Sequence, residues 1–193
     1  MAEVKGTEST EEPIFSRPVE VERILQEEIE ERIEASADEL AVIAAFLELN
    51  ALKSLRAEVK LAAWRRKGVK LSGRFEAVAE QDCVVTLDPI DCRYAEEFVR
   101  TFLPEDMLAR FNGSEDLVEA EGEDPPDPIE GGSIDVGAVI LEELALSINP
   151  YPRKEGAAID SRYSGGDLDD SEAPTRPFAQ LLALKKQTGE DNR

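Results

Sequence analysis

Apolar and polar residues alternate most regularly between residues 54 and 79. Within residues 55–63 every second side chain is apolar and most of the others are charged, and the same pattern returns in residues 69–77. A period of two residues is typical of a strand with one buried face. The segments are separated by the basic residues 65–67 and by Gly68, which we expect to supply the positive φ of a tight connection. The pattern predicts an antiparallel hairpin with a basic tip.

A helical period marks two other segments. In residues 135–149 apolar side chains recur every third or fourth position and form one buried face. Ser133 and Asp135 can cap the start of this helix, and Pro150 cannot continue it. Ser36 precedes a second amphipathic segment with acidic residues in its first turn, which is a typical start for a helix. We therefore predict two principal helices.

The other structured segments are shorter. We expect strands at residues 19–21, 83–87 and 98–103, because apolar and β-branched residues there are bounded by polar or proline-containing stretches. Residues 32–35 fit a short strand or the end of a helix, and residues 116–121 are a further candidate strand. The predicted fold class is α+β: a mainly antiparallel sheet of about five or six short strands, two principal helices and a short C-terminal helix.

Polar stretches define the predicted domain organisation. Residues 1–12 are acidic and are expected to be disordered, and residues 13–159 are predicted to form a single α+β domain. Residues 160–175 read as a flexible linker. An apolar face in residues 176–186 predicts a short helix that docks on the domain or on a partner, followed by a tail at 187–193.

Composition removes several classes of function. The chain of 193 residues has no histidine and two cysteines, which excludes Ser-His-Asp and Cys-His catalysis and the usual zinc sites. It has no phosphate-binding glycine loop, no apolar run of about 18 residues that would span a membrane, and no signal or transit peptide. We predict a cytoplasmic protein with no catalytic residues, metal, cofactor, small-molecule substrate or membrane contact. The abundant carboxylates leave a magnesium-dependent enzyme as an alternative.

Charge is distributed unevenly along the chain. The net charge is −21, yet residues 51–74 contain eight basic residues and only one acidic residue. In one interpretation these cations protect a sheet edge and offset the surrounding acid. In the other, the hairpin tip binds phosphate groups of RNA or a protein partner, and its tryptophan stacks on a base. The candidate contact residues are Trp64, Arg65, Arg66, Lys67, Lys70 and Arg74.

A second candidate contact patch follows from the helix at residues 135–149. Its wetter side and the segment after its last turn carry acidic, aromatic and basic side chains. The residues of this second patch are Glu142, Glu143, Tyr151, Arg153 and Lys154.

Five short motifs occur in an order that points to a known family. They are Phe15–Val19, Cys83–Pro89, Ile134–Gly137, Pro150–Lys154 and Pro177-Phe178. In this order they resemble the YceD family of large ribosomal RNA subunit accumulation proteins, over about residues 14–186, and most of all its alphaproteobacterial members.

The resemblance carries expectations about function and about a metal. It implies a role in the accumulation of 23S ribosomal RNA, and no catalytic activity. Many relatives have a Cys-x-x-Cys pair that suggests a metal clip, but here Thr86 replaces the second cysteine after Cys83, and Cys92 is too far along the chain to substitute. We therefore expect no metal, with this element held by packing alone.

Beside the magnesium-dependent enzyme, there are two functional hypotheses. In the first, the chain is a non-enzymatic factor in large-subunit biogenesis that acts on precursor rRNA through the hairpin tip, while its acidic surface engages a basic ribosomal protein or another assembly factor. In the second, it is an acidic escort for a basic ribosomal protein and does not contact RNA.

Overall fold

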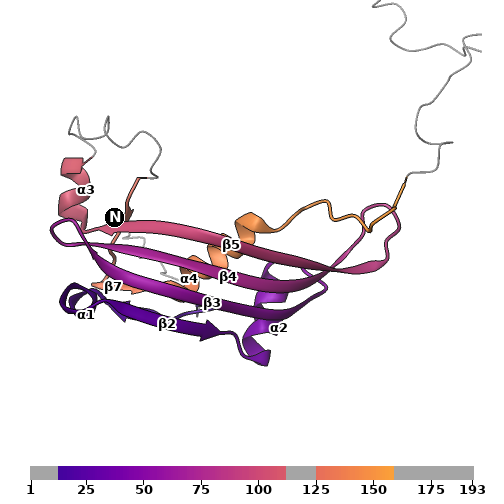
Figure 1. Ribbon diagram of the computed structural model, residues 1–193, viewed down its shortest axis with the longest axis horizontal. Coiled ribbons are helices and arrows are strands. Elements are labelled where there is room, and N and C mark those ends of the chain that lie inside the picture. The colour runs from indigo at the N-terminus through magenta and orange to yellow at the C-terminus, as the bar shows by residue number, and fades with distance from the viewer. Residues whose placement is uncertain (1–12, 112–124, 159–193) are drawn as a thin grey trace, which may run out of the picture. The chain divides into compact units, whose positions relative to one another are not determined.

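The computed structural model describes residues 13–111 and 125–158 (Figure 1). The chain divides into two units, Met1–Glu155 and Gly156–Arg193, and the architecture below is that of the first unit. The described residues form a five-stranded sheet of order β2-β3-β4-β5-β6, a two-stranded sheet β1-β7, and four helices. The predicted α+β class and the mainly antiparallel sheet are confirmed.

The elements have the following bounds. The strands are β1 (Pro18–Glu20), β2 (Ile29–Glu34), β3 (Ala51–Trp64), β4 (Gly68–Asp82), β5 (Pro89–Leu103), β6 (Asp127–Pro128) and β7 (Ser133–Asp135). The helices are α1 (Val21–Gln26), α2 (Ala37–Phe46), α3 (Glu105–Phe111) and α4 (Val136–Ser147). Both principal helices were predicted, and the ambiguous segment near residue 32 is a strand.

The predicted hairpin forms the centre of the larger sheet. β3 and β4 pair antiparallel from Trp64 opposite Gly68 to Ala51 opposite Glu80, with one irregularity between Leu52 and Ser54. β2 flanks β3, and β5 flanks β4 along its length, an order that can be followed across the sheet in Figure 1. The hairpin is longer than the alternating pattern alone indicated.

One face of the sheet packs against helices. The buried residues alternate along the central strands, as a period of two requires, and they join apolar side chains of α2 and α4 in one core. The largest fully buried members from the sheet and these helices are Leu55, Leu61, Leu71, Phe75, Ile43, Ile140 and Leu144. The opposite face carries charged side chains such as Arg56 and Arg74, which are exposed. We call it the open face.

Asp135 ties the start of α4 to the N-terminal segment. Its Oδ1 accepts hydrogen bonds from the Ala138 N–H at 3.2 Å, which caps the helix, and from the Arg17 N–H at 2.7 Å. The Ser16 hydroxyl donates to Oδ2 at 2.6 Å. Gly137 allows this approach, because a Cβ there would lie 2.7 Å from the carbonyl oxygen of Phe15.

Ser36 and Glu39 form the start of α2. The Ser36 hydroxyl accepts from the Glu39 N–H at 3.3 Å, and the Glu39 carboxylate accepts from the Ser36 N–H at 2.8 Å, which is a capping box. Both terminal guanidinium nitrogens of Arg17 also donate to this carboxylate, at 2.8 and 3.1 Å. These hydrogen bonds, that from Arg17 above all, lower the pKa of Glu39 to about 2.

One strand prediction is wrong and another is too short. Residues 83–88 form a turn, in which the Cys83 N–H donates to Asp88 O and the Leu87 N–H donates to Cys83 O. Leu87 has a φ of 60°, which no strand residue adopts. β5 then begins at Pro89 and not at Phe98, so it runs the full length of its partner β4. Helix α1 was not predicted.

The role expected for Gly68 is also wrong. Gly68 does not have a positive φ; Arg65 at 51° and Lys67 at 145° have it. A Cβ at position 68 would lie 2.8 Å from the side chain of Leu103 and from the carbonyl oxygens of Phe102 and Trp64. Glycine is therefore required there for close packing against the end of β5 and not for the turn.

Several predictions fall outside the described residues. They are the disordered N-terminus at 1–12, the candidate strand at 116–121, the linker at 160–175, the helix at 176–186 and the tail at 187–193.

Candidate functional site

The hairpin tip consists of residues 65–67, which connect β3 to β4. All three are exposed, whereas Trp64 is half-buried at the end of β3. The guanidinium carbon of Arg65 lies 4.6 Å from the centroid of the Trp64 ring, a distance at which cation and aromatic face attract each other. An aromatic ring and a stacked cation therefore form the end of the hairpin.

Three further cations beside this ring are uncompensated. Among the described residues, Arg66, Lys67 and Lys70 have no hydrogen-bond or ion-pair partner. Lys70 alternates with the buried Val69 and Leu71, and so it projects from the open face. Arg66, Lys67 and Lys70 thus present positive charge that no carboxylate of the described residues neutralises.

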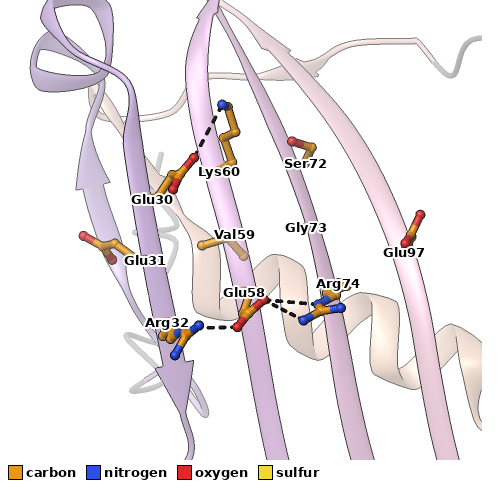
Figure 2. A pocket seen from close by; sticks show the side chains of 10 residues that line it. All are labelled: Glu30, Glu31, Arg32, Glu58, Val59, Lys60, Ser72, Gly73, Arg74 and Glu97. Atoms are coloured by element: carbon orange, nitrogen blue, oxygen red, sulfur yellow. Dashed lines mark hydrogen bonds and ion pairs between the residues drawn. The ribbon is translucent and has the colours of Figure 1, made fainter.

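Farther along the open face the charges neutralise one another, as Figure 2 shows. Glu58 bridges Arg32 at 3.0 Å and Arg74 at 2.8 Å. Lys60 pairs with Glu28 at 2.5 Å and also reaches Glu30. Arg74, a candidate contact residue from the sequence, is therefore compensated and differs in this respect from Lys70.

A shallow groove of about 610 Å³ lies over these paired charges. Arg32, Glu58, Arg74 and Glu97 contribute to its lining and form a row of alternating sign across β2, β3, β4 and β5. The groove is open to solvent and its basic side chains are held by carboxylates, so it offers a phosphate group far less positive charge than the tip does.

The strand register places residues of β5 near the basic side chains of the hairpin, which the sequence alone did not predict. Lys70 lies between Ala62 of β3 and Thr101 of β5, and on the next row Ser72 lies between Lys60 of β3 and Val99 of β5. Val99 is 52% exposed. These β5 residues lie on the same face as the basic hairpin, a fact that needs the strand pairing and has no local sequence signal.

The second candidate patch contains two separate groups of contacts. Glu143 and Glu142 accept from Arg100 at 3.1 and 3.4 Å, and Asp127 pairs with the same guanidinium at 2.8 Å. Lys154 instead pairs with Asp88 at 3.0 Å. The acidic members thus bind Arg100 of β5, and Lys154 binds the turn at 83–88.

The two remaining members of that patch are more accessible. Tyr151 is 70% exposed, and Arg153 is exposed with no ion-pair or hydrogen-bond partner among the described residues. These two residues are the accessible part of the second patch.

The turn at 83–88 is held by hydrogen bonds as well as by packing. Cys83 is fully buried, and its sulfur accepts from the Lys154 N–H at 3.3 Å. This bond, followed by one from the Thr86 side chain, lowers the pKa of Cys83 to about 6 despite burial. The Val84 N–H also donates to Pro152 O at 2.9 Å. The expectation that packing alone holds this element is wrong.

Two further features concern the described residues: clusters of metal-ligating side chains and helices that could span a membrane. Within residues 13–111 and 125–158, no group of three or more His, Cys, Asp or Glu side chains could hold a metal ion. None of the described helices is long and apolar enough to cross a membrane.

The fold and this site define a class of protein: an α+β domain whose candidate binding surface consists of charged side chains on the open face of its sheet. A family model described as "Large ribosomal RNA subunit accumulation protein YceD" matches residues 71–185, and the chain belongs to this family. The predicted membership is confirmed, and with it a role in the accumulation of large-subunit ribosomal RNA. No curated protein and no solved structure matches the chain. The matched region begins after the hairpin tip, so the family match does not include residues 65–67.

Proposed function

We propose that this protein is a non-enzymatic factor in large-subunit biogenesis that contacts precursor ribosomal RNA through the hairpin tip. The observation that carries the proposal is the cluster of uncompensated cations, Arg66, Lys67 and Lys70, beside the chain's single tryptophan. Cations contribute affinity for phosphates by releasing counterions, and an aromatic ring stacks on bases of any identity.

The geometry favours unpaired RNA over a duplex. A stacking contact needs a base outside a helix, and loops, bulges and ends of RNA supply such bases. Arg65 already stacks on Trp64, and a base can take its place or extend the stack. The net charge of −21 repels RNA at long range, so the contact is confined to groups within a Debye length of about 8–10 Å from the tip.

In-cell crosslinking of the full chain to RNA tests the proposal. The variant Arg66→Glu/Lys67→Glu/Lys70→Glu reverses the uncompensated charges, and we expect it to lose crosslinks to large-subunit precursor RNA. Trp64→Ala should weaken them and Trp64→Phe should retain most of them, because phenylalanine still stacks. Circular dichroism checks that each variant is folded.

A charge-matched variant controls for the change in net charge. Arg23→Glu/Arg32→Glu/Arg56→Glu alters the total charge equally at exposed side chains away from the tip, and the exposed ion pairs that it breaks contribute little stability. An equal loss of crosslinks in both triple variants would contradict the proposal that RNA binds at the hairpin tip. Unchanged crosslinks in the tip variant, with retained binding of a basic ribosomal protein, would instead support the escort function.

A further inference from the structure

One edge of the larger sheet is largely unpaired. β5 pairs with β4 from Pro89 to Phe102, but on its other side the described chain pairs only with Phe102 and Leu103, through β6. From Pro89 to Thr101 the outer edge of β5, uppermost in Figure 1, has no strand partner in the described residues. Such an edge presents a row of backbone N–H and C=O groups to another strand.

Several of the devices that protect natural edge strands are absent from β5, although the strand carries exposed charged side chains such as Arg93 and Glu97. Natural edge strands are blunted by lysines, internal prolines, bulges or short length. β5 contains no lysine, its one proline is its first residue, and its register with β4 is unbroken. The edge is therefore a regular template along its full free length.

The unpaired part of β5 and two of its charged side chains are arranged symmetrically about the same residue. Ala95 is the midpoint between Pro89 and Thr101. Two copies of β5 that pair antiparallel about Ala95 place Arg93 of each copy opposite Glu97 of the other. Both side chains are exposed and have no ion-pair partner among the described residues. Opposite charges directly across an antiparallel pair attract.

The register centred on Ala95 avoids the repulsion between like charges that a shifted register would create. About Ala95, Tyr94 faces Glu96 and Asp91 faces Val99, so that no two like charges are opposed. A shift of the centre to residue 96 opposes Glu96 to itself, and a shift to residue 94 opposes Asp91 to Glu97. Like charges directly opposite destabilise a strand pair, so the charges select the register centred on Ala95.

We propose that two copies of this chain associate through antiparallel pairing of their β5 edges, centred on Ala95, to form one continuous sheet. The pairing closes about a two-fold axis perpendicular to the sheet, so each copy uses the same edge. It adds about a dozen backbone hydrogen bonds between the copies and two symmetric Arg93–Glu97 contacts. The proposal is independent of RNA binding.

Disulfide trapping tests the register in the full chain. In a Cys92→Ser background, Ala95→Cys faces its own copy at a Cα separation of about 4.5–5.5 Å, within the range for a disulfide. The matched control Arg93→Cys lies about 14 Å from its copy along the strand. Mild oxidation should give a covalent dimer for the first variant and not for the second. Equal crosslinking of both, or of neither, overturns the register.

Charge exchange tests the contact itself. Sedimentation equilibrium of the full chain should show a dimer, and Arg93→Glu or Glu97→Arg alone should raise its dissociation constant roughly tenfold. The double variant Arg93→Glu/Glu97→Arg should restore dimerisation, whereas Arg66→Glu, at the tip, should leave it unchanged. A wild-type chain that stays monomeric at every soluble concentration, or a double variant that is not rescued, overturns the proposal.

Discussion

Glu39 combines two structural tasks in one carboxylate. It closes the capping box of α2 with Ser36 and accepts hydrogen bonds from both terminal guanidinium nitrogens of Arg17, whose backbone N–H donates to Asp135, the N-cap of α4. The Arg17 and Glu39 side chains are 34% and 26% exposed, so solvent screens their attraction only in part. One acidic side chain thus links the N-terminal segment to the first principal helix.

The depressed pKa of Glu39 predicts a pH-dependent contribution to stability. A carboxyl with a lowered pKa stabilises the fold above its unfolded value of 4.5, and this contribution is lost as pH falls toward about 2. Glu39→Gln should lower the free energy of unfolding by about 1–2 kcal/mol near neutral pH, after allowance for screening. Urea denaturation should show this difference shrinking at about pH 3. A difference that is equal at both pH values would contradict the prediction.

The thiol of Cys83 gives a second titration that can be measured directly. Its pKa of about 6 lies below the ordinary value of 9.0, mainly because the Lys154 N–H and then Thr86 donate to the sulfur. In a Cys92→Ser background, ultraviolet absorbance of the thiolate should rise with a midpoint near pH 6. The matching stability is present above the unfolded pKa and is lost as pH falls through about 6. Cys83→Ser should remove both signals, and a midpoint near the ordinary value would contradict the assignment.

At the scale of elements, glycines mark the closest contacts between segments. Gly137 brings α4 against the backbone of Phe15 and Arg17, and Gly73 on β4 faces the ring of Phe98 and the carbonyl of Glu58. A Cβ at either position would meet atoms within about 3 Å, which are all backbone at Gly137 and include two side chains at Gly73. These contacts fix where α4 and the flanking strands lie.

Gly137→Ala should therefore destabilise the fold, although alanine favours a helix. The added Cβ would lie 2.7 Å from Phe15 O and 2.9 Å from Arg17 N, atoms that belong to backbone and cannot rotate away. We expect a loss of about 1–3 kcal/mol in the free energy of unfolding. Leu146→Ala, at a side chain 74% exposed on the same helix, is the control and should change it by less than about 0.5 kcal/mol. A stabilised Gly137→Ala would show that the segments separate easily.

Elements with a strong period were predictable from the sequence, and those decided by distant contacts were not. The hairpin and both principal helices follow from periods of 2 and 3.6 residues. The turn at 83–88 resembles a strand locally, because Val84, Val85 and Thr86 are β-branched, and only its bonds to Asp88 and Pro152 decide otherwise. The basic cluster was found by composition, but its division into paired and uncompensated cations depends on register.

At the scale of the whole molecule, a basic tip exists within a strongly acidic chain. The net charge is −21, and much of the positive charge on the open face forms ion pairs with carboxylates on or next to the neighbouring strands. Long-range repulsion therefore opposes any extended contact with a polyanion, while the tip attracts phosphate locally. The expected RNA contact is small.

Salt dependence measures the size of that contact. With three phosphates neutralised by Arg66, Lys67 and Lys70, the logarithm of the affinity for single-stranded RNA should fall with the logarithm of salt at a slope of about −2. A filter-binding or anisotropy titration over a range of salt concentrations gives this slope. The tip variant should flatten it toward zero, and a slope several times steeper would mean that a larger surface binds RNA.

The position of the only tryptophan has a practical consequence. Since Trp64 is the single indole in the chain and lies beside the stacked Arg65, its fluorescence reports the state of the hairpin tip without an added label. A base that stacks on the ring should quench the emission, whereas a partner bound at the β5 edge should leave it nearly unchanged. The native chain therefore carries its own optical probe, which distinguishes occupancy of the tip from association of two copies in a single titration.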